Sequence, residues 1–586
     1  MVRNLRIKNY NTMEQKILDS VNNWLNDDYD QDTKNEIRRL MAEDPTEITE
    51  SFYRTLEFGT GGLRGIMGVG PNRMNKYTVA SATQGLANYL KINYPETDLK
   101  VVVSHDSRNN SRFFAEVTAQ VFAANGILCY LFDSLRPTPE LSYAVRHLNC
   151  HAGVMVTASH NPKEYNGYKA YWTDGGQIIP PHDKGIINEV NAITSIHQIK
   201  WEGNKDKIVI INKEVDDRYL EKIAGLSLNP EAIQRHKNLS IVYTPLHGTG
   251  ITMVPKALEM FGFTNVTVLA SQRNPDGNFP TVASPNPEEK SAMQLAMAEA
   301  DKIGADLVLA TDPDADRVGI AVRNHKGEME LFNGNMTGSL LIYYMLSQWS
   351  AKRKITGKEF IVKTIVTTEL IRTIADSFKV ECFDVLTGFK YIADKIQSLP
   401  DRRFIAGGEE SYGYLIGDFV RDKDAVSACC MIAEMTAVLA DEGKTLYDLR
   451  QDLYKKYGYY QESLLSITKK GQQGANEIQQ MMTGYRTCPP MVINQSPVIK
   501  IIDYKSSESI DFQNNKKEII DLPKSDVLQF FTADGTKITV RPSGTEPKIK
   551  FYFGVKEDLK PNDNLEQIHQ KLQAKIDAVI DSLKLR

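Results

Sequence analysis

Short apolar runs typical of β-strands alternate with helical patterns along most of this chain, and no other feature limits its possible folds as strongly. Leu99–Val103, Ile127–Phe132 and Gly153–Val156 predict strands, and Phe113–Ala124 predicts a helix between the first two. Such alternation is typical of α/β layers built on a parallel or mixed sheet. We therefore expect this part of the chain to form an α/β domain.

The same rhythm begins again twice further along the chain. A length of 586 residues, at about 100–200 residues per domain, allows three to five domains. Two further α/β domains fit this range. Their predicted strands are Ser240–Tyr243, Val266–Ala270 and Asp306–Ala310, and then Phe360–Thr364 and Phe404–Ala406.

The two ends of the chain have different patterns. Apolar residues at helical spacing, such as Ile17, Val21 and Leu25, predict a helical lead-in, with a second helix over Glu36–Met41. The last hundred or so residues predict an α+β domain with an antiparallel sheet and a long helix over Asn564–Leu583. Its strands are expected around Val498–Ile502, Val527–Phe531, Lys537–Arg541 and Lys548–Gly554.

The fold class is therefore α/β, with three successive α/β domains that have mixed sheets and a C-terminal α+β domain. Lapses in periodicity, with more Gly and charge, mark the candidate boundaries. We expect the domains to span residues 1–210, 211–325, 326–460 and 461–586.

Composition and charge exclude several classes of function. The net charge is −4 with the two signs interspersed, which argues against a nucleic-acid surface. No segment reaches the ~18 uncharged apolar residues of a membrane helix, and no apolar run follows the first basic residues as in a secretion signal. We expect a cytoplasmic protein with neither nucleic-acid nor membrane partners, and the six scattered cysteines are interpreted as reduced packing residues.

A serine lies at the carboxyl end of a predicted strand, where α/β sheets bind ligands. The segment is Gly153-Val154-Met155-Val156-Thr157-Ala158-Ser159-His160-Asn161-Pro162. Ser159 is not in a Gly-x-Ser-x-Gly elbow, and no Asp and His are indicated as hydrolase partners. His160 is adjacent in sequence, an arrangement that rarely places a base correctly. On its own the segment is also compatible with a simple turn.

Three carboxylates follow another predicted strand at alternate positions, in Thr311-Asp312-Pro313-Asp314-Ala315-Asp316-Arg317. They repel one another unless a cation lies among them, and Mg2+ normally joins carboxylates to phosphate oxygens. An EF-hand is excluded because Arg317 and Arg323 occupy its Gly and Glu positions. A haloacid-dehalogenase-like aspartyl phosphotransferase is a weaker alternative, because Asp316 replaces its usual Thr or Val, and a solvated acidic turn is the other.

Two further polar segments have weak signals when taken alone. Gly407-Gly408-Glu409-Glu410-Ser411-Tyr412-Gly413 can hydrogen-bond sugar hydroxyls. Arg541-Pro542-Ser543-Gly544-Thr545-Glu546-Pro547-Lys548 offers a guanidinium, hydroxyls and backbone N–H groups to a phosphate. A surface loop and a hairpin turn are the simpler interpretations. No Walker phosphate loop is present in the sequence.

Together and in this order, the four segments resemble the α-D-phosphohexomutase family, which includes phosphoglucomutase and phosphomannomutase. The resemblance spans about Phe58 to Tyr552. It implies four domains that each give one loop to a central cleft. The extension of the serine segment over Lys163–Trp172 is most similar to the phosphoglucomutase-2 and phosphopentomutase branch.

The resemblance also implies roles for residues at matching positions. Ser159 would be the phosphoserine, and its phosphate would hold Mg2+ together with Asp312, Asp314 and Asp316. The implied catalytic residues are Ser159, Lys169 as general acid/base, Arg64, Arg317 and His160. The implied substrate-binding residues are Lys390, Glu409 and Ser411 for the sugar and Arg541, Ser543, Gly544 and Thr545 for its phosphate.

The implied activity is interconversion of a sugar 1-phosphate and a sugar 6-phosphate, with glucose or mannose as the sugar. Glucose 1,6-bisphosphate or an equivalent would be the intermediate and activator, and the partners would be small-molecule sugar phosphates. Tyr412-Gly413 follows Ser411, so a histidine that some members carry in the sugar loop has no counterpart here. The alternatives are a phosphopentomutase acting on ribose or deoxyribose 1-phosphate and a non-catalytic sugar-phosphate-binding protein.

Overall fold

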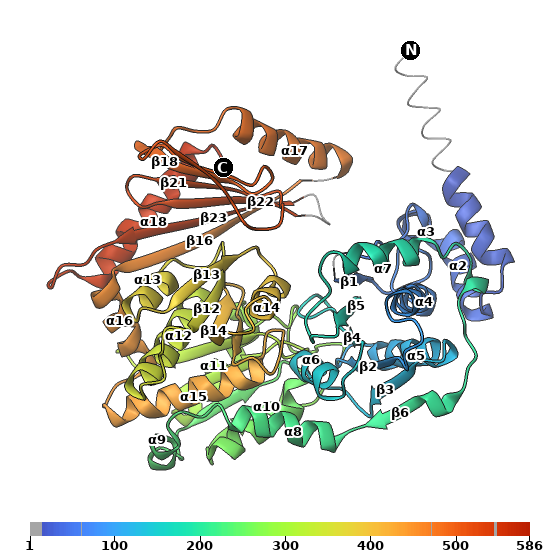
Figure 1. Ribbon diagram of the computed structural model, residues 1–586, viewed down its shortest axis with the longest axis horizontal. Coiled ribbons are helices and arrows are strands. Elements are labelled where there is room, and N and C mark those ends of the chain that lie inside the picture. The colour runs from blue at the N-terminus through green and yellow to red at the C-terminus, as the bar shows by residue number, and fades with distance from the viewer. Residues whose placement is uncertain (1–14, 60, 470, 544–547) are drawn as a thin grey trace. The chain divides into compact units, whose positions relative to one another are not determined.

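The computed structural model describes residues 15–59, 61–469, 471–543 and 548–586. The chain forms two compact units (Figure 1). The first contains the chain up to Phe332 together with Gly413–Val438, and the second contains Asn333–Tyr412 and Leu439–Arg586. The fold class is confirmed: there are three α/β domains and a C-terminal α+β domain. The central cleft stays a prediction.

The first sheet has six strands in the order β1-β5-β4-β2-β3-β6. Strands β4, β2, β3 and β6 are parallel neighbours, whereas β5 and β1 continue the sheet in antiparallel fashion. The strands are β1 (Gly62–Ile66), β2 (Lys100–His105), β3 (Leu128–Phe132), β4 (Ala152–Val156), β5 (Tyr165–Trp172) and β6 (Ile208–Ile211). The helices packed with them are α4 (Lys76–Asn93), α5 (Ser111–Ala124), α6 (Thr138–His147) and α7 (His182–Asn191).

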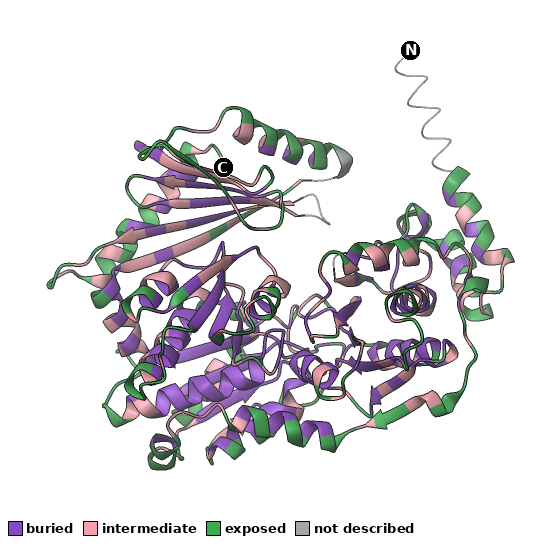
Figure 2. Cartoon of the chain, in the orientation of Figure 1, coloured by how far each residue is buried: buried purple, intermediate pink, exposed green. Residues whose placement is uncertain are grey.

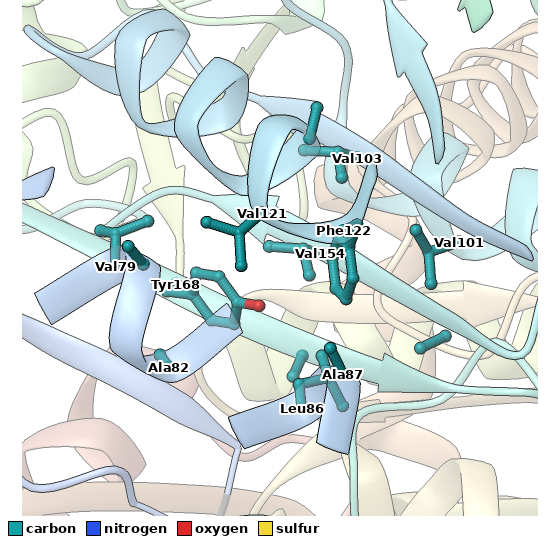
Figure 3. Close-up of a cluster of buried hydrophobic side chains, with 14 of the residues drawn as sticks. Val79, Ala82, Leu86, Ala87, Val101, Val103, Val121, Phe122, Val154 and Tyr168 are labelled. Carbon is teal, nitrogen blue, oxygen red and sulfur yellow. The ribbon is translucent and has the colours of Figure 1, made fainter. Parts of the chain in front are cut away.

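The core of this domain lies between the sheet and its helices. Val101, Val154 and Tyr168 of the strands meet Leu86 of α4 and Phe122 of α5 (Figure 3), and all five are fully buried. Figure 2 shows that strands such as β2 and β4 are buried, whereas the outer faces of the helices are exposed. Burial of this kind contributes about 25 cal/mol per Å² of apolar surface, which makes the sheet a firm support for the loops at its strand ends.

The N-terminal lead-in is helical, as predicted. Residues 15–26 are helical, and α2 (Gln31–Glu43) and α3 (Pro45–Phe52) follow. Asp30 caps α2 by accepting a hydrogen bond from the N–H of Thr33, and it also accepts one from the Tyr77 hydroxyl of α4. These helices therefore bind to α4 by a polar contact as well as by apolar packing.

The second sheet has five strands in the order β11-β10-β9-β7-β8. Residues 326–332, which the sequence analysis assigned to the third domain, include β11, and β11 pairs with β10. The strands are β7 (Ile241–Thr244), β8 (Val266–Val268), β9 (Leu307–Thr311), β10 (Val318–Arg323) and β11 (Met329–Phe332). The helices are α8 (Lys213–Ala224), α9 (Pro230–Arg235), α10 (Gly250–Phe261) and α11 (Lys290–Ile303). Strand β15 (Gly413–Ile416) and most of α15 (Ala425–Asp441) also belong to the first unit.

The second unit contains two sheets. Strand β12 (Glu359–Thr364) lies between β13 (Glu381–Val385) and β14 (Arg403–Glu409), both parallel to it. The accompanying helices are α12 (Gly334–Ala351), α13 (Leu370–Ser377), α14 (Phe389–Gln397) and α16 (Leu446–Tyr457). Strand β14 continues through Glu409, so the first half of the expected sugar loop is strand.

The last sheet is antiparallel and has the order β16-β23-β22-β21-β18-β19-β20, with β17 beside β18. Its long strand β16 (Tyr459–Thr468) was not predicted from the sequence, and it spans the expected domain boundary between residues 460 and 461. The other strands are β17 (Val492–Ile493), β18 (Ser496–Asp503), β19 (Glu508–Asp511), β20 (Lys516–Ile519), β21 (Leu528–Thr532), β22 (Lys537–Pro542) and β23 (Lys548–Glu557). The helices are α17 (Gly471–Thr487) and α18 (Leu565–Ser582).

None of the helices in the described part of the chain is both long and apolar enough to cross a membrane.

Candidate active site

Ser159 lies in the loop that follows β4, and its side chain points at a carboxylate. Its hydroxyl donates to Oδ2 of Asp312 at 2.7 Å. Nδ1 of His160 lies 3.2 Å from the same hydroxyl. Ser159 is 3% exposed and has φ +52°, a left-handed conformation that a non-glycine residue rarely adopts. The local backbone is therefore held in an unusual shape around a buried hydroxyl.

The three aspartates come directly after β9, in a tight turn. Ala315 has φ +51°, which folds the chain back so that the N–H groups of Asp316 and Arg317 donate to Oδ1 of Asp312. All three carboxylates are buried, and each offers an oxygen within 4.8 Å of the others. The turn thus brings three carboxyl groups together beside the Ser159 hydroxyl.

Lys169 is positioned by a strand that the sequence analysis treated as an extension of the serine loop. Residues 165–172 form β5, in which Lys169 pairs with Met155 of β4. Its Nζ lies 2.7 Å from Oδ2 of Asp314 and 3.2 Å from Oδ2 of Asp316. Burial lowers the pKa of Lys169, but the charges of Asp314 and Asp316 outweigh it, so its pKa is raised. Lys169 is therefore an ammonium in this arrangement.

The carboxylates differ in protonation because their partners differ. Burial, and after it the charges of Asp314 and Asp316, raises the pKa of Asp312 well above its usual range. Burial acts in the same direction on Asp314, but Lys169 overcomes it and lowers the pKa of Asp314. The pKa of Asp316 is also lowered, against burial and the Asp314 charge, by Lys169 and Lys423.

The same carboxylates fit a hard divalent cation. Oδ1 of Asp314 and Oδ1 of Asp316 are buried, and neither accepts a hydrogen bond from any described residue. An all-oxygen set of this kind matches the ligands that Mg2+ prefers. The cluster could hold a metal with Asp312, Asp314 and Asp316 as its protein ligands.

Two arginines predicted from the sequence lie at this cluster. Arg64 of β1 donates to Oδ1 of Asn161 at 3.4 Å, and the three aspartates and Arg317 are its electrostatic neighbours. Gly62 allows β1 to approach β5, because a Cβ at Gly62 would lie 1.7 Å from the Tyr168 carbonyl oxygen. Arg317 is ion-paired with Glu288 and lies 3.9 Å from Oδ1 of Asp316.

His160 is neutral in this surrounding. Burial, together with the charges of Arg317 and Arg64, lowers the pKa of His160 well below its usual range. Its backbone carbonyl accepts a hydrogen bond from the Ser284 hydroxyl. His160 can therefore accept or donate one hydrogen bond at Ser159 without bringing a charge.

The structure adds residues that the sequence analysis left without a role. Lys423, in the charged stretch 421–424, has its Nζ 3.2 Å from Oδ2 of Asp316. Next to it, Asp422 accepts a hydrogen bond from the Tyr171 hydroxyl at 2.7 Å. Asp106 and Arg108, which follow β2, contact the serine loop. The signal for the latter pair was available: polar residues directly after the strand next to β4.

The other predicted residues belong to the second unit. Oε1 of Glu409 accepts a hydrogen bond from the N–H of Gly388, which directly precedes α14. Lys390 lies in the first turn of α14, with its Nζ 5.2 Å from the centroid of the Tyr391 ring. Ser411 lies in the turn after β14.

Arg541 is the second-last residue of β22, and Ser543 directly follows this strand. Burial and the charges of Glu410 and Glu409 raise the pKa of Tyr552 on β23, and Arg541 opposes this rise. The N–H of Ser543 donates to the Lys548 carbonyl at 2.7 Å. Gly544 and Thr545 lie outside the described residues.

Known protein families match this chain along most of its length. Three phosphoglucomutase/phosphomannomutase α/β/α domain models match residues 55–197 (domain I), 217–327 (domain II) and 333–457 (domain III), and the C-terminal domain model matches residues 505–568. A phosphoglucomutase of Staphylococcus haemolyticus is 37% identical over 529 residues, covering 89% of this chain and 93% of the relative. One of Staphylococcus aureus is 39% identical over 535 residues, covering 90% and 94%.

Solved structures show the same fold. A putative phosphomannomutase from Thermus thermophilus has a TM-score of 0.65 at 20% identity, covering 91% of this chain and 98% of the other. Parafusin, a phosphoglucomutase from Paramecium, also has a TM-score of 0.65, at 17% identity, covering 90% and 96%. The chain therefore belongs to the phosphoglucomutase/phosphomannomutase family and is a phosphohexomutase, an isomerase of carbohydrate metabolism.

Proposed function

We propose that this enzyme interconverts glucose 1-phosphate and glucose 6-phosphate, with Ser159 as the phosphoryl carrier. One observation carries the proposal: the Ser159 hydroxyl, buried in the first domain, lies 2.7 Å from a carboxylate of the acidic cluster in the second. A phosphoryl group on this serine would need its charge neutralised, and a cation among the carboxylates would do so.

Mg2+ is the cation that we propose, held by Asp312, Asp314 and Asp316 together with a phosphate oxygen on Ser159. The buried Oδ1 atoms of Asp314 and Asp316 support this assignment because they accept no hydrogen bond from the described residues. When bound, Mg2+ supplies charge neutralisation at the phosphate oxygens.

The protein residues align and neutralise the transferred group. In the first half-reaction a free sugar hydroxyl attacks phosphorus, the bond between phosphorus and Ser159 Oγ breaks, and a new phosphorus–oxygen bond forms on the sugar. Lys169 is our candidate for the proton-transferring group: its ammonium would give a proton to Ser159 Oγ as that oxygen leaves phosphorus, and the neutral amine would then take up the proton of the sugar hydroxyl. Arg64 and Arg317 would offer guanidinium groups to the phosphoryl oxygens. Neutral His160 would position the Ser159 oxygen.

The second half-reaction returns the other phosphate to Ser159. The intermediate is glucose 1,6-bisphosphate, which must present its opposite end before the second transfer. Glu409, Ser411 and Lys390 would bind the sugar, and Arg541, Ser543, Gly544 and Thr545 would bind whichever phosphate is not reacting. The charges of Arg541 and Glu409 both affect the pKa of Tyr552, which supports a shared sugar-phosphate site in that unit.

Glucose is favoured as the sugar because the relatives at 37–39% identity are phosphoglucomutases. Mannose phosphates, pentose phosphates and binding without turnover remain the alternatives. A cytoplasmic location, the absence of nucleic-acid and membrane partners, and the domain boundaries also stay predictions from the sequence.

A panel of 1-phosphates of glucose, mannose, glucosamine, ribose and deoxyribose, each with and without Mg2+ and glucose 1,6-bisphosphate, tests this function. We expect magnesium-dependent turnover with kcat/KM highest for glucose 1-phosphate. A higher kcat/KM for ribose 1-phosphate than for glucose 1-phosphate would make the enzyme a phosphopentomutase. If no sugar phosphate is turned over, the remaining alternative is a non-catalytic sugar-phosphate-binding protein.

A further inference from the structure

Arg108 holds the serine loop by its backbone. Its Nη2 donates to the carbonyl of Ser159 at 2.6 Å and to that of Asn161, and its Nη1 donates to Pro162 at 2.8 Å and Tyr165 at 3.1 Å. One planar guanidinium thus gathers four carbonyls from both ends of the loop. The planar guanidinium presents its N–H donors in a fixed geometry, and the side chain of a lysine or an amide cannot make the same four hydrogen bonds.

Asp106 completes this arrangement from the other side. It pairs with Arg108 at 3.4 Å, and neither side chain has any exposed surface. Its Oδ2 accepts a hydrogen bond from the Thr157 hydroxyl at 2.6 Å, and the Thr157 oxygen in turn accepts one from the N–H of Ser159 at 2.8 Å. The N–H of Asp106 donates to the Val156 carbonyl, so the pair is anchored to the end of β4.

Both peptide groups that flank Ser159 are therefore fixed by one ion pair. The N–H side is held through Thr157 and Asp106, and the carbonyl side is held by Arg108. These two constraints act at the residue with φ +52°. The left-handed conformation is unfavourable for a non-glycine residue, so it persists only when its surroundings determine it.

The second domain covers the pair and keeps water away from it. The Phe279 ring lies against the Arg108 guanidinium, with 5.0 Å between the guanidinium carbon and the ring centroid. Gly277 approaches Arg108 so closely that a Cβ there would lie 2.8 Å from the Arg108 carbonyl carbon. In a dry site these charge-assisted hydrogen bonds are stronger than they would be in water.

We infer that Arg108, paired with Asp106, is a positioning residue that holds the Ser159 loop in the left-handed shape that aims its hydroxyl at Asp312. The inference rests on the proposed role of Ser159 as phosphoryl carrier. Arg108 contacts Ser159 through its backbone carbonyl and not through its hydroxyl. Loss of Arg108 should therefore misplace the reacting oxygen without removing a group that binds the sugar.

Arg108→Met tests this role, with Arg323→Met as the matched control. Arg323 also donates to three backbone carbonyls, those of Ala305, Gly327 and Ala300, and is ion-paired with Asp301, but it lies at the far end of β10. Both variants lose comparable hydrogen bonds. The measurements are kcat and KM for glucose 1-phosphate per folded molecule, and the single-turnover rate at which glucose 1,6-bisphosphate phosphorylates Ser159, followed by intact mass.

For Arg108→Met we expect kcat and the phosphorylation rate to fall together by about 10²-fold, the cost of misplacing a reacting atom by about 1 Å, with KM unchanged. Arg323→Met should lower thermal stability but keep the kcat of the wild type. Should Arg108→Met not fold, Arg108→Lys keeps the charge without the fork, and its kcat should still fall with KM constant. Wild-type kcat in the folded Arg108 variants would overturn the inference. An inactive wild type would instead overturn the proposed function.

Discussion

The Ser159 hydroxyl donates to Oδ2 of Asp312 at 2.7 Å, although 153 positions separate the two residues in the chain. This bond joins the ends of β4 and β9, which belong to different sheets. Each strand is buried and ends in a loop with a positive φ, at Ser159 in one and Ala315 in the other. The site is thus assembled where two different sheets present the carboxyl ends of β4 and β9 to each other.

Metal removal should abolish turnover. Treatment with a chelator followed by readdition of Mg2+ is expected to remove and then restore activity, because without a cation the carboxylates of Asp312, Asp314 and Asp316 repel a phosphoryl group. Asp314→Asn should raise the Mg2+ concentration for half-maximal activity by about tenfold or more. Asp301→Asn, at an exposed aspartate, is the control. An unchanged Mg2+ requirement in Asp314→Asn would contradict the assigned ligands.

Lys169→Met should lower kcat by about 10²–10⁴-fold, the range for loss of a group that transfers a proton in the transition state. The ammonium contacts both Asp314 and Asp316 and is 8% exposed, so solvent cannot substitute for it easily. Lys163→Met, at an exposed lysine of the serine loop just before β5, should behave as the wild type. Steady-state kinetics measure kcat for both variants. If Lys169→Met has the same kcat as Lys163→Met within error, Lys169 is not the proton-transferring group.

Arg541→Met should raise KM for glucose 1-phosphate by about 10–100-fold while kcat stays near the wild-type value. A hydrogen bond to a charged group contributes about 1.5–3 kcal/mol, and here the charge is the phosphate that does not react. Lys556→Met on β23 provides the control. A drop in kcat with constant KM would instead place Arg541 at the transferred group.

Acid should weaken the first domain through His105. Burial lowers the pKa of His105 to about 4 from 6.5, and its Nδ1 lies 2.8 Å from the Asp106 carbonyl. Because the folded pKa is below the unfolded one, the unfolded chain takes up the proton first, and stability falls as the pH decreases from about 6.5 to 4. Between pH 7 and pH 5 the loss should be about 2 kcal/mol. Urea unfolding of the wild type and of His105→Gln measures it, and equal pH dependence in both would refute the role of His105.

The sequence predicted the parts of the site that lie at strand ends. Ser159 and the three aspartates each follow a continuous apolar run. Each segment alone is also compatible with a simple turn, so the prediction rested on the order of all four segments and their resemblance to a family. The strand β5 was missed because Asn166 and Gly167 resemble a turn in the sequence. In the structure Gly167 is needed for a different reason: it lies against the Thr157 carbonyl, where a Cβ would clash. That strand is what brings Lys169 to the aspartates.

Other features could not be predicted because they depend on contacts between distant segments. The position of Arg108 after a strand was visible in the sequence, but its hydrogen bonds to the serine loop depend on a segment more than 50 residues away. Strand β16 has a half-exposed burial pattern, so its apolar periodicity is weak, and its pairing with β23 is what defines it. The assignment of residues 326–332 to the second sheet likewise depends on the pairing of β10 with β11.

Phosphorylation of Ser159 is the central claim, and intact mass spectrometry tests it most directly. Wild-type protein and Ser159→Ala are each incubated with glucose 1,6-bisphosphate and Mg2+, and their masses are compared before and after. The account predicts a gain of one phosphoryl group in the wild type, removal of that group by glucose 1-phosphate, and no gain in Ser159→Ala. A wild type that never gains the phosphoryl group, or a Ser159→Ala variant that gains it and retains turnover, would contradict the account.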